Sequence, residues 1–331
     1  MGTPAYRDMN FHQALNPDFD ELLALFATQP KASQWSVQVY RDRFDQITSW
    51  FPAPADVEVL RLSPGGVPVD RLRAPDGRDS HHLVYFHGGG YVGSTPENHR
   101  EVVARIARAS RTTAWNVGYR IAPEDPFPAA PQDSIAAYIG LVESEQINPE
   151  RTVLAGDSAG GGLVVATMMG LRDQSYPLPA GGVCFSPWFD LACTGESITT
   201  NADYDINVRE KGLRRCADLY LAGHDPKDPM ASPLYGDLKG LPPMLIQVAT
   251  TEILFSDAAR FAAKAEASGV DVCLEPWHHS FHFWHGFTPA FKKGQVATER
   301  AAEFINACIQ KADAKPMRPD HIDLRQSIQS S

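Results

Sequence analysis

Ser158 lies in the sequence GDSAG, between an apolar segment at residues 152–155 and a second apolar segment that begins at residue 161. An apolar segment followed by small residues and a longer apolar segment predicts a buried strand that turns directly into a helix. A serine at such a turn has a strained backbone and an exposed hydroxyl group, as a nucleophile requires. Gly156 and Gly160 fit this interpretation, because a side chain at either position would collide with the neighbouring strand and helix.

Backbone N–H groups that could bind a developing negative charge are predicted at two places. The helix that begins after Ser158 directs its free N–H groups and the positive end of its dipole toward the serine, and Ala159 supplies the first of these groups. The sequence HGGG at residues 87–90 follows another apolar segment, and its glycines allow the backbone to approach a ligand closely. We therefore predict an oxyanion hole formed by the amides of Gly88, Gly89 and Ala159, with His87 anchoring the loop by hydrogen bonds.

Strand and helix patterns alternate along most of the chain, which predicts an α/β protein with a mostly parallel sheet and helices on both faces. An alternating pattern indicates two antiparallel strands first, joined by the turn SPGG at residues 63–66. About eight strands are predicted, at residues 56–62, 67–73, 81–90, 112–119, 151–156, 180–188, 242–250 and 270–277. Helices are predicted at residues 101–110, 129–144, 161–172, 209–223, 257–269 and 298–312.

Two segments do not fit the alternation of strands and helices. Residues 1–50 have mostly helical patterns, one of them starting near Asn16, and residues 190–230 are irregular and polar. We predict that both segments form a helical cap over the carboxyl ends of the strands; the alternative for residues 1–50 is that they cover a sheet edge. The domains are then an N-terminal cap segment at 1–50, a catalytic domain at 51–315 with its second cap segment at about 190–230, and a polar tail at 316–331.

The composition excludes several classes of protein. A net charge of −10 over 331 residues argues against nucleic acid and anionic membranes as partners. Five cysteines at irregular spacing, without a CxxC pair, suggest reduced thiols in a cytoplasmic protein rather than a disulfide framework or a thiolate metal site. We expect no signal peptide, no membrane span and no metal site, since neither HExxH nor a comparable ligand pattern is present.

Several motifs together resemble one known family. HGGGY, YRIAPEDPFPAAPQD, GDSAGGG, SPWFDL and MASPLYGDLKGLPPMLIQV follow one another between about residues 80 and 290. In this order and spacing they are similar to the hormone-sensitive-lipase-like family of α/β-hydrolases, in its bacterial carboxylesterase branch. The resemblance implies an α/β-hydrolase fold, hydrolysis of short-acyl carboxylic esters of small molecules through an acyl-enzyme, no cofactor and often a homodimer.

The resemblance also implies a catalytic triad in the order serine, acid, histidine, with Ser158 as the nucleophile. The family usually has an aspartate after the strand predicted at residues 242–250, but this chain has TTEILFSD there. Aligning Leu254 with the leucine that follows the family's acid assigns the acid to Glu252. The alternative is that Glu252 caps the next helix and that Asp257 orients the base.

The base is expected after the last strand, where the sequence WHHSFHFWHGF contains four histidines. Counting from the aromatic residue that closes the strand, the resemblance places the base at His282. His285 is the alternative, because the family often has the sequence HGF at this point.

Neither the substrate nor the activity follows from the triad alone. Tyr91, Trp188 and Phe283 are candidates for the substrate pocket, as are Trp284, Trp35 and Phe44, although an ordinary place in the core is the simpler expectation for each. A small-molecule receptor of the same fold is the alternative from another class, and the retained histidines argue against it. An amidase, lactonase or carbamate hydrolase would use the same triad.

Overall fold

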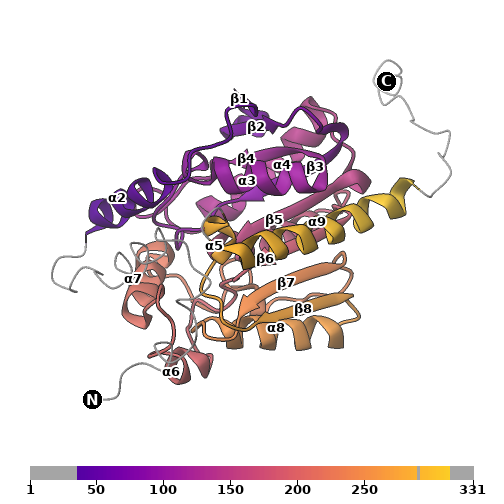
Figure 1. The fold of residues 1–331 in the computed structure, drawn as a ribbon. Helices are drawn as coiled ribbons and strands as arrows, with labels where there is room; N and C mark the ends of the chain where they lie inside the picture. The colour runs from indigo at the N-terminus through magenta and orange to yellow at the C-terminus, as the bar shows by residue number, and fades with distance from the viewer. Residues whose placement is uncertain (1–35, 289–290, 314–331) are drawn as a thin grey trace.

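The computed structural model describes residues 36–288 and 291–313, which form an eight-stranded sheet in the order β1-β2-β4-β3-β5-β6-β7-β8 (Figure 1). Strand β2 pairs antiparallel with β1 and β4, and the remaining pairs are parallel. The predicted mostly parallel sheet of about eight strands is therefore confirmed. The strands are β1 (Glu58–Leu62), β2 (Val69–Arg73), β3 (Arg78–Phe86), β4 (Thr112–Val117), β5 (Thr152–Asp157), β6 (Gly181–Phe185), β7 (Met244–Ala249) and β8 (Val272–Trp277).

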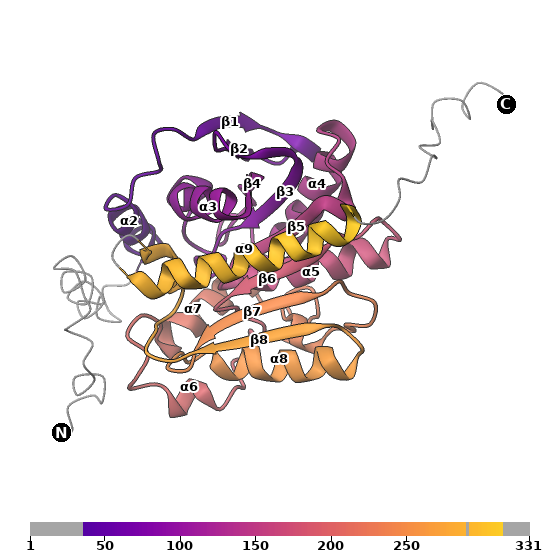
Figure 2. The ribbon, with the colours of Figure 1, turned by 45° about the vertical axis from the view of Figure 1, so that its right-hand side comes forward.

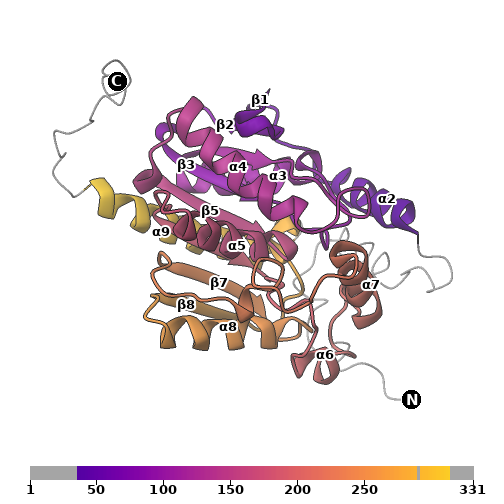
Figure 3. The same ribbon diagram turned by 180° about the vertical axis from the view of Figure 1, so that it is seen from behind.

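Helices cover both faces of the sheet because successive strand residues point to opposite sides. Leu83 and Tyr85 belong to a core that includes α3 (Pro96–Ser110) and α9 (Lys292–Asp313) (Figure 2). Val84 and Phe86, their neighbours on β3, belong to the core that includes α4 (Ala129–Ser144), α5 (Ala159–Asp173) and α8 (Phe255–Ala267) (Figure 3). None of the helices in the described part of the chain is long and apolar enough to cross a bilayer.

The element boundaries differ from the predicted ones mainly where polar residues begin a helix. Helix α3 begins at Pro96, five residues before the predicted start, because Thr95 caps it and Pro96 occupies its first turn. Helix α9 similarly begins at Lys292, before its apolar repeat. The short helix α6 (Ser197–Thr200) was not predicted, since four residues give no recognisable periodicity. Strand β3 ends at Phe86, so the whole HGGG sequence is a loop.

The carboxyl ends of the parallel strands meet at one edge of the sheet, where ligands bind in such folds. Two helices from outside the strand–helix alternation, α2 (Val37–Thr48) and α7 (Glu210–Leu221), lie near this edge (Figure 1). The helix predicted near Asn16, the residue Trp35 and the tail at 316–331 lie outside the described residues.

Close backbone contact explains the glycines around Ser158. A Cβ atom added to Gly160 would lie 2.0 Å from the carbonyl oxygen of Phe86, and one added to Gly156 would lie 2.4 Å from the carbonyl oxygen of Gly160. Both distances are impossible for real carbon atoms, so only glycine lets α5 start this close to β3 and β5.

Candidate active site

Ser158 sits at a sharp turn between β5 and α5 with a strained backbone. Its φ of 51° and ψ of −118° are rarely adopted by a residue with a side chain. Two backbone hydrogen bonds hold this geometry: the Ser158 N–H donates to the Phe185 oxygen (2.9 Å), and the Ser158 oxygen accepts from the Trp188 N–H (2.9 Å). Such strain costs on the order of 1–3 kcal/mol and persists only where the surroundings enforce it. The turn places the Ser158 side chain on the wall of a cavity.

Glu252 and His282 form a buried hydrogen-bonded pair. Glu252 Oε2 lies 2.7 Å from His282 Nδ1, and the carboxylate is fully buried. The other oxygen, Oε1, accepts hydrogen bonds from the Ser186 hydroxyl (2.7 Å) and from the Ala249 N–H (2.7 Å). Ser186 Oγ in turn accepts from the N–H of Phe283, next to the histidine (3.0 Å). The carboxylate is therefore fixed in position and orients the imidazole ring.

This pairing changes the proton affinity of His282. Burial alone would lower the pKa of His282, but the charge of Glu252 and its hydrogen bond outweigh burial and raise the pKa above its ordinary value. Asp205 contributes in the same direction. Because Nδ1 is bonded to Glu252, Nε2 is the nitrogen left for the cavity that His282 and Ser158 both line.

The alternative acid, Asp257, has other partners. It accepts hydrogen bonds from the N–H groups of Phe189 (3.2 Å) and Asp190 (3.0 Å) and forms an ion pair with Arg260 (3.1 Å). Burial, followed by the charge of Asp190, raises the pKa of Asp257 to about 7. As predicted, it lies in the first turn of α8, and the geometry favours Glu252 over it as the partner of the imidazole.

The alternative base, His285, is also bonded elsewhere. Its Nε2 lies 2.8 Å from the Gln247 Oε1, and its ring is fully buried against Phe185 and Trp284. Burial lowers the pKa of His285 to about 3, and the residue is not part of the cavity wall. The structure thus brings His282, rather than His285, to the cavity that contains Ser158.

The predicted role of Gly88 in the oxyanion hole is wrong. The Gly88 N–H donates to Asp157 Oδ1 (2.9 Å), and Gly88 does not line the cavity. Gly89 and Gly90 do line it, with φ of 108° and 61°. Gly90, the third glycine of the same motif, was not among the predicted donors. The sequence does not show which amide of the loop forms a hydrogen bond within the protein and is therefore withdrawn from the cavity. Ala159, the third predicted donor, begins α5 immediately after Ser158.

Asp157, the last residue of β5, is a buried carboxylate that accepts several hydrogen bonds. This role was not predicted from the sequence. The Oδ1 atom of Asp157 accepts from the Tyr85 hydroxyl (2.9 Å) as well as from Gly88, and it lies 3.1 Å from His99 Nε2. Burial alone would raise the pKa of Asp157, but His99 and the hydrogen bond from Tyr85 outweigh it and lower the pKa. A charged residue at the end of an otherwise apolar strand was the available signal for this role.

His87 has the anchoring position that was predicted for it. Its Nδ1 lies 2.7 Å from the Gly88 oxygen, and its ring stacks on Tyr119 at a centroid distance of 4.3 Å. The Tyr119 hydroxyl donates to the His87 backbone oxygen (2.6 Å). These contacts fix the start of the HGGG loop.

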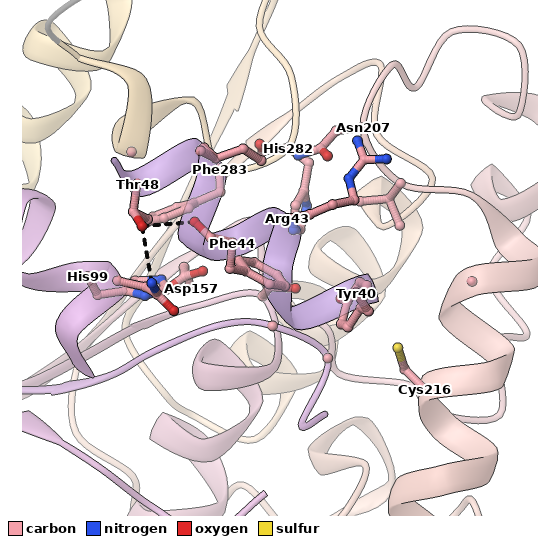
Figure 4. A pocket seen from close by; sticks show the side chains of 18 of the residues that line it. Tyr40, Arg43, Phe44, Thr48, His99, Asp157, Asn207, Cys216, His282 and Phe283 are labelled. Atoms are coloured by element: carbon pink, nitrogen blue, oxygen red, sulfur yellow. Dashed lines mark hydrogen bonds and ion pairs between the residues drawn. The ribbon is translucent and has the colours of Figure 1, made fainter. Parts of the chain in front are cut away.

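The cavity has a volume of about 560 Å³ and is lined by Ser158, by His282 and by residues of α2 and α7. Figure 4 shows His282 together with Tyr40 and Phe44 of α2 and Cys216 of α7. Of the predicted pocket residues, Phe283 and Phe44 line the cavity. Tyr91 and Trp188 do not line it. The ring of Tyr91 stacks on that of Tyr220 at a centroid distance of 3.9 Å, and Trp188 is fully buried. Trp284 is likewise a core residue. An aromatic residue in the sequence can therefore line a pocket or belong to the core, and the sequence alone does not show which.

The chain is similar to known proteins in both sequence and structure. The family model described as the α/β-hydrolase fold matches residues 83–286. An acetyl-hydrolase of Streptomyces hygroscopicus is 46% identical over 231 residues, which are 70% of this chain and 77% of the relative. An esterase of Acinetobacter venetianus is 29% identical over 289 residues, which are 87% of this chain and 95% of the relative. The crystal structure of an esterase from the bacterial hormone-sensitive lipase family is 41% identical with a TM-score of 0.85, covering 89% of this chain and 99% of that one.

The matched family model, the sheet and the close structural similarity define a carboxylic ester hydrolase of the α/β-hydrolase fold. The chain belongs to the hormone-sensitive-lipase-like family, as its motifs indicated.

The contact between Glu252 and His282 predicts a measurable change in proton affinity. Glu252→Gln removes the charge that raises the pKa of His282, so the pKa should fall and the imidazole should become neutral at lower pH. An NMR titration of the histidine signals measures this shift. Asp257→Asn is the control and should leave the pKa of His282 unchanged. A lower pKa of His282 in Asp257→Asn, with no change in Glu252→Gln, would contradict the pairing of Glu252 with His282.

Proposed function

We propose that the protein is a serine carboxylesterase that hydrolyses short-acyl esters through an acyl-enzyme, with Ser158, His282 and Glu252 as its triad. The observation that carries this proposal is the 2.7 Å contact between Glu252 and His282 on a cavity that Ser158 also lines. A serine at a strained turn, a base held by a carboxylate, and nearby amides are the parts that acyl transfer requires.

In the proposed first half-reaction, Ser158 Oγ attacks the ester carbonyl while its proton moves to Nε2 of His282. Glu252 holds the imidazole in the required tautomer and stabilises the imidazolium that forms, as the raised pKa of His282 indicates. His282 then donates the proton to the departing alcohol, which leaves the acyl group on Ser158.

In the second half-reaction, His282 takes a proton from water as the water oxygen attacks the acyl carbonyl. His282 then returns this proton to Ser158 Oγ as the bond between Oγ and the acyl carbon breaks, which releases the carboxylic acid and restores Ser158. The tetrahedral oxyanion of each step needs hydrogen-bond donors. We assign these to the amides of Gly89, Gly90 and Ala159, because Gly88 donates to Asp157. Each donor of this kind stabilises a transition state by about 2.7–4 kcal/mol.

We assign α2 and the segment around α7 to the cap that encloses the acyl group. Tyr40, Phe44 and Ile47 of α2 line the same cavity as Leu213 of α7, so two separate segments of the chain contribute to its wall. A cavity of this size limits the depth available to an acyl chain. A relative named as an acetyl-hydrolase supports a preference for short acyl groups.

The triad assignment predicts a non-additive pattern of activity. Ser158→Ala and His282→Ala should each lower kcat by about three orders of magnitude or more, and the double variant should be little worse than either, because the two residues act as a unit. Steady-state hydrolysis of p-nitrophenyl butyrate, with circular dichroism to establish folding, measures this. Full turnover by folded Ser158→Ala enzyme would contradict the assignment.

The size of the cavity, about 560 Å³, predicts a limit on acyl length. The value of kcat/KM for p-nitrophenyl esters should be highest for short acyl groups and fall for long ones. A series from acetate to palmitate, measured below the solubility limit of each ester, tests this. Faster hydrolysis of long-chain esters would contradict the proposed short-acyl preference without affecting the triad.

A further inference from the structure

Helix α2 lies directly against the loop that follows β3 and carries the glycines of the proposed oxyanion hole. A Cβ atom added to Gly93 would lie 2.9 Å from ring atoms of both Tyr40 and Phe44, on α2. One added to Gly90 would lie 3.0 Å from the Cys216 Sγ, on α7. Neither glycine has room for a side chain unless its neighbours move, so the loop and the helices are in close contact.

Four hydrogen bonds join Arg41, on α2, to the catalytic domain. Its Nε donates to the Val92 backbone oxygen (2.9 Å), and its Nη2 donates to the Ala122 backbone oxygen (3.0 Å). Nη1 and Nη2 also donate to the two carboxylate oxygens of Glu124 (2.9 and 2.6 Å). Because the guanidinium is planar and its donors point in fixed directions, these four acceptors hold it in one orientation.

The two backbone acceptors belong to a hydrogen-bond network that includes Gly89. The Gly89 oxygen accepts from the Val92 N–H (3.1 Å), which closes a tight turn. The Ala122 N–H donates to the oxygen of Tyr91, the residue before Val92 (2.8 Å). Arg41 therefore joins the end of this turn to the segment that binds its middle.

Both carbonyl groups depend on a donor that comes from outside the sheet. Val92 and Ala122 are fully buried, whereas the Arg41 side chain is one-quarter exposed. A buried backbone oxygen needs a hydrogen-bond donor, and a charged donor forms a stronger bond than a neutral one. The position of the turn is thus tied to a side chain of α2.

We propose that Arg41 is a positioning residue for the oxyanion hole, because it fixes the turn that carries the amides of Gly89 and Gly90. The proposal rests on the proposed function, which assigns oxyanion binding to those amides. Donors of this kind stabilise a transition state only from the correct position, so a displaced turn weakens catalysis more than it weakens substrate binding. Helix α2 then has two roles, since other residues of the helix line the cavity.

A matched pair of inhibitors separates transition-state binding from ordinary binding. An alkyl trifluoromethyl ketone adds to an activated serine and forms a tetrahedral oxyanion, whereas the corresponding methyl ketone binds without forming this adduct. The inhibition constant of the first compound therefore reports the oxyanion hole, and that of the second reports the cavity wall. Absence of inhibition of the native enzyme by the trifluoromethyl ketone would contradict the proposed function and this proposal with it.

Arg41→Met keeps an apolar side chain of similar length but has no donor. Its kcat/KM for p-nitrophenyl acetate should fall by about ten- to a hundredfold. The inhibition constant of the trifluoromethyl ketone should rise in proportion, while that of the methyl ketone should change little. Arg41→Lys keeps the charge but not the fork of donors, so both constants should lie between those of the native enzyme and Arg41→Met.

Two control variants separate this role from a general loosening of α2. Glu124→Gln removes an exposed carboxylate but leaves both backbone oxygens bound to Arg41, so it should change the constants little. Asp45→Ala breaks a different contact of α2, with Asn98 on α3 (2.9 Å), and should also leave the trifluoromethyl ketone constant in place. An unchanged constant in folded Arg41→Met and Arg41→Lys, or an equal rise in Asp45→Ala, would overturn the proposal.

Discussion

The buried carboxylate of Asp157 is the constraint on which the geometry of the site depends. It ends β5, next to Ser158, and it binds the first amide of the loop that follows β3. A buried charge of this kind is tolerated only when hydrogen bonds satisfy it, and here Tyr85, Gly88 and His99 do so. The turn that carries the serine and the loop that carries the glycines are therefore fixed relative to each other. Because one amide is used for this purpose, the next two glycines are the ones that reach the cavity.

The parallel sheet brings the remaining parts together. Ser158, Ser186, Glu252 and His282 each follow the carboxyl end of a different strand, and those ends lie side by side at one edge. Glu252 therefore meets His282 across 30 residues of sequence, and Ser186 links the acid to the backbone next to the base. Helices α2 and α7 contribute residues to the remaining wall of the cavity. The sheet edge thus fixes the relative positions of the proposed triad, and the added helices form another part of the cavity wall.

Local patterns were enough to predict the strands, most helices and the position of Ser158 at the turn between β5 and α5, because hydrophobic periodicity and small residues at a turn are visible within a few neighbouring residues. The distinction between His282 and His285 depends on partners 30 and 38 residues away, Glu252 and Gln247, so the sequence indicated it only through family resemblance. Gly88 was misassigned because its amide acceptor lies 69 residues away. Whether Tyr91 and Trp188 line the pocket or belong to the core stayed open for a similar reason, since burial depends on the packing of segments that sequence alone does not bring together.

The central claim is that Ser158 is the residue that becomes acylated. The most direct test is mass spectrometry of the intact protein and its peptides after reaction with phenylmethylsulfonyl fluoride, which transfers a sulfonyl group to an activated serine. The account predicts a single adduct on the peptide that contains Ser158, formed in parallel with the loss of esterase activity and much more slowly in His282→Ala. Complete inactivation with the adduct on another residue, and with Ser158 unmodified, would contradict it.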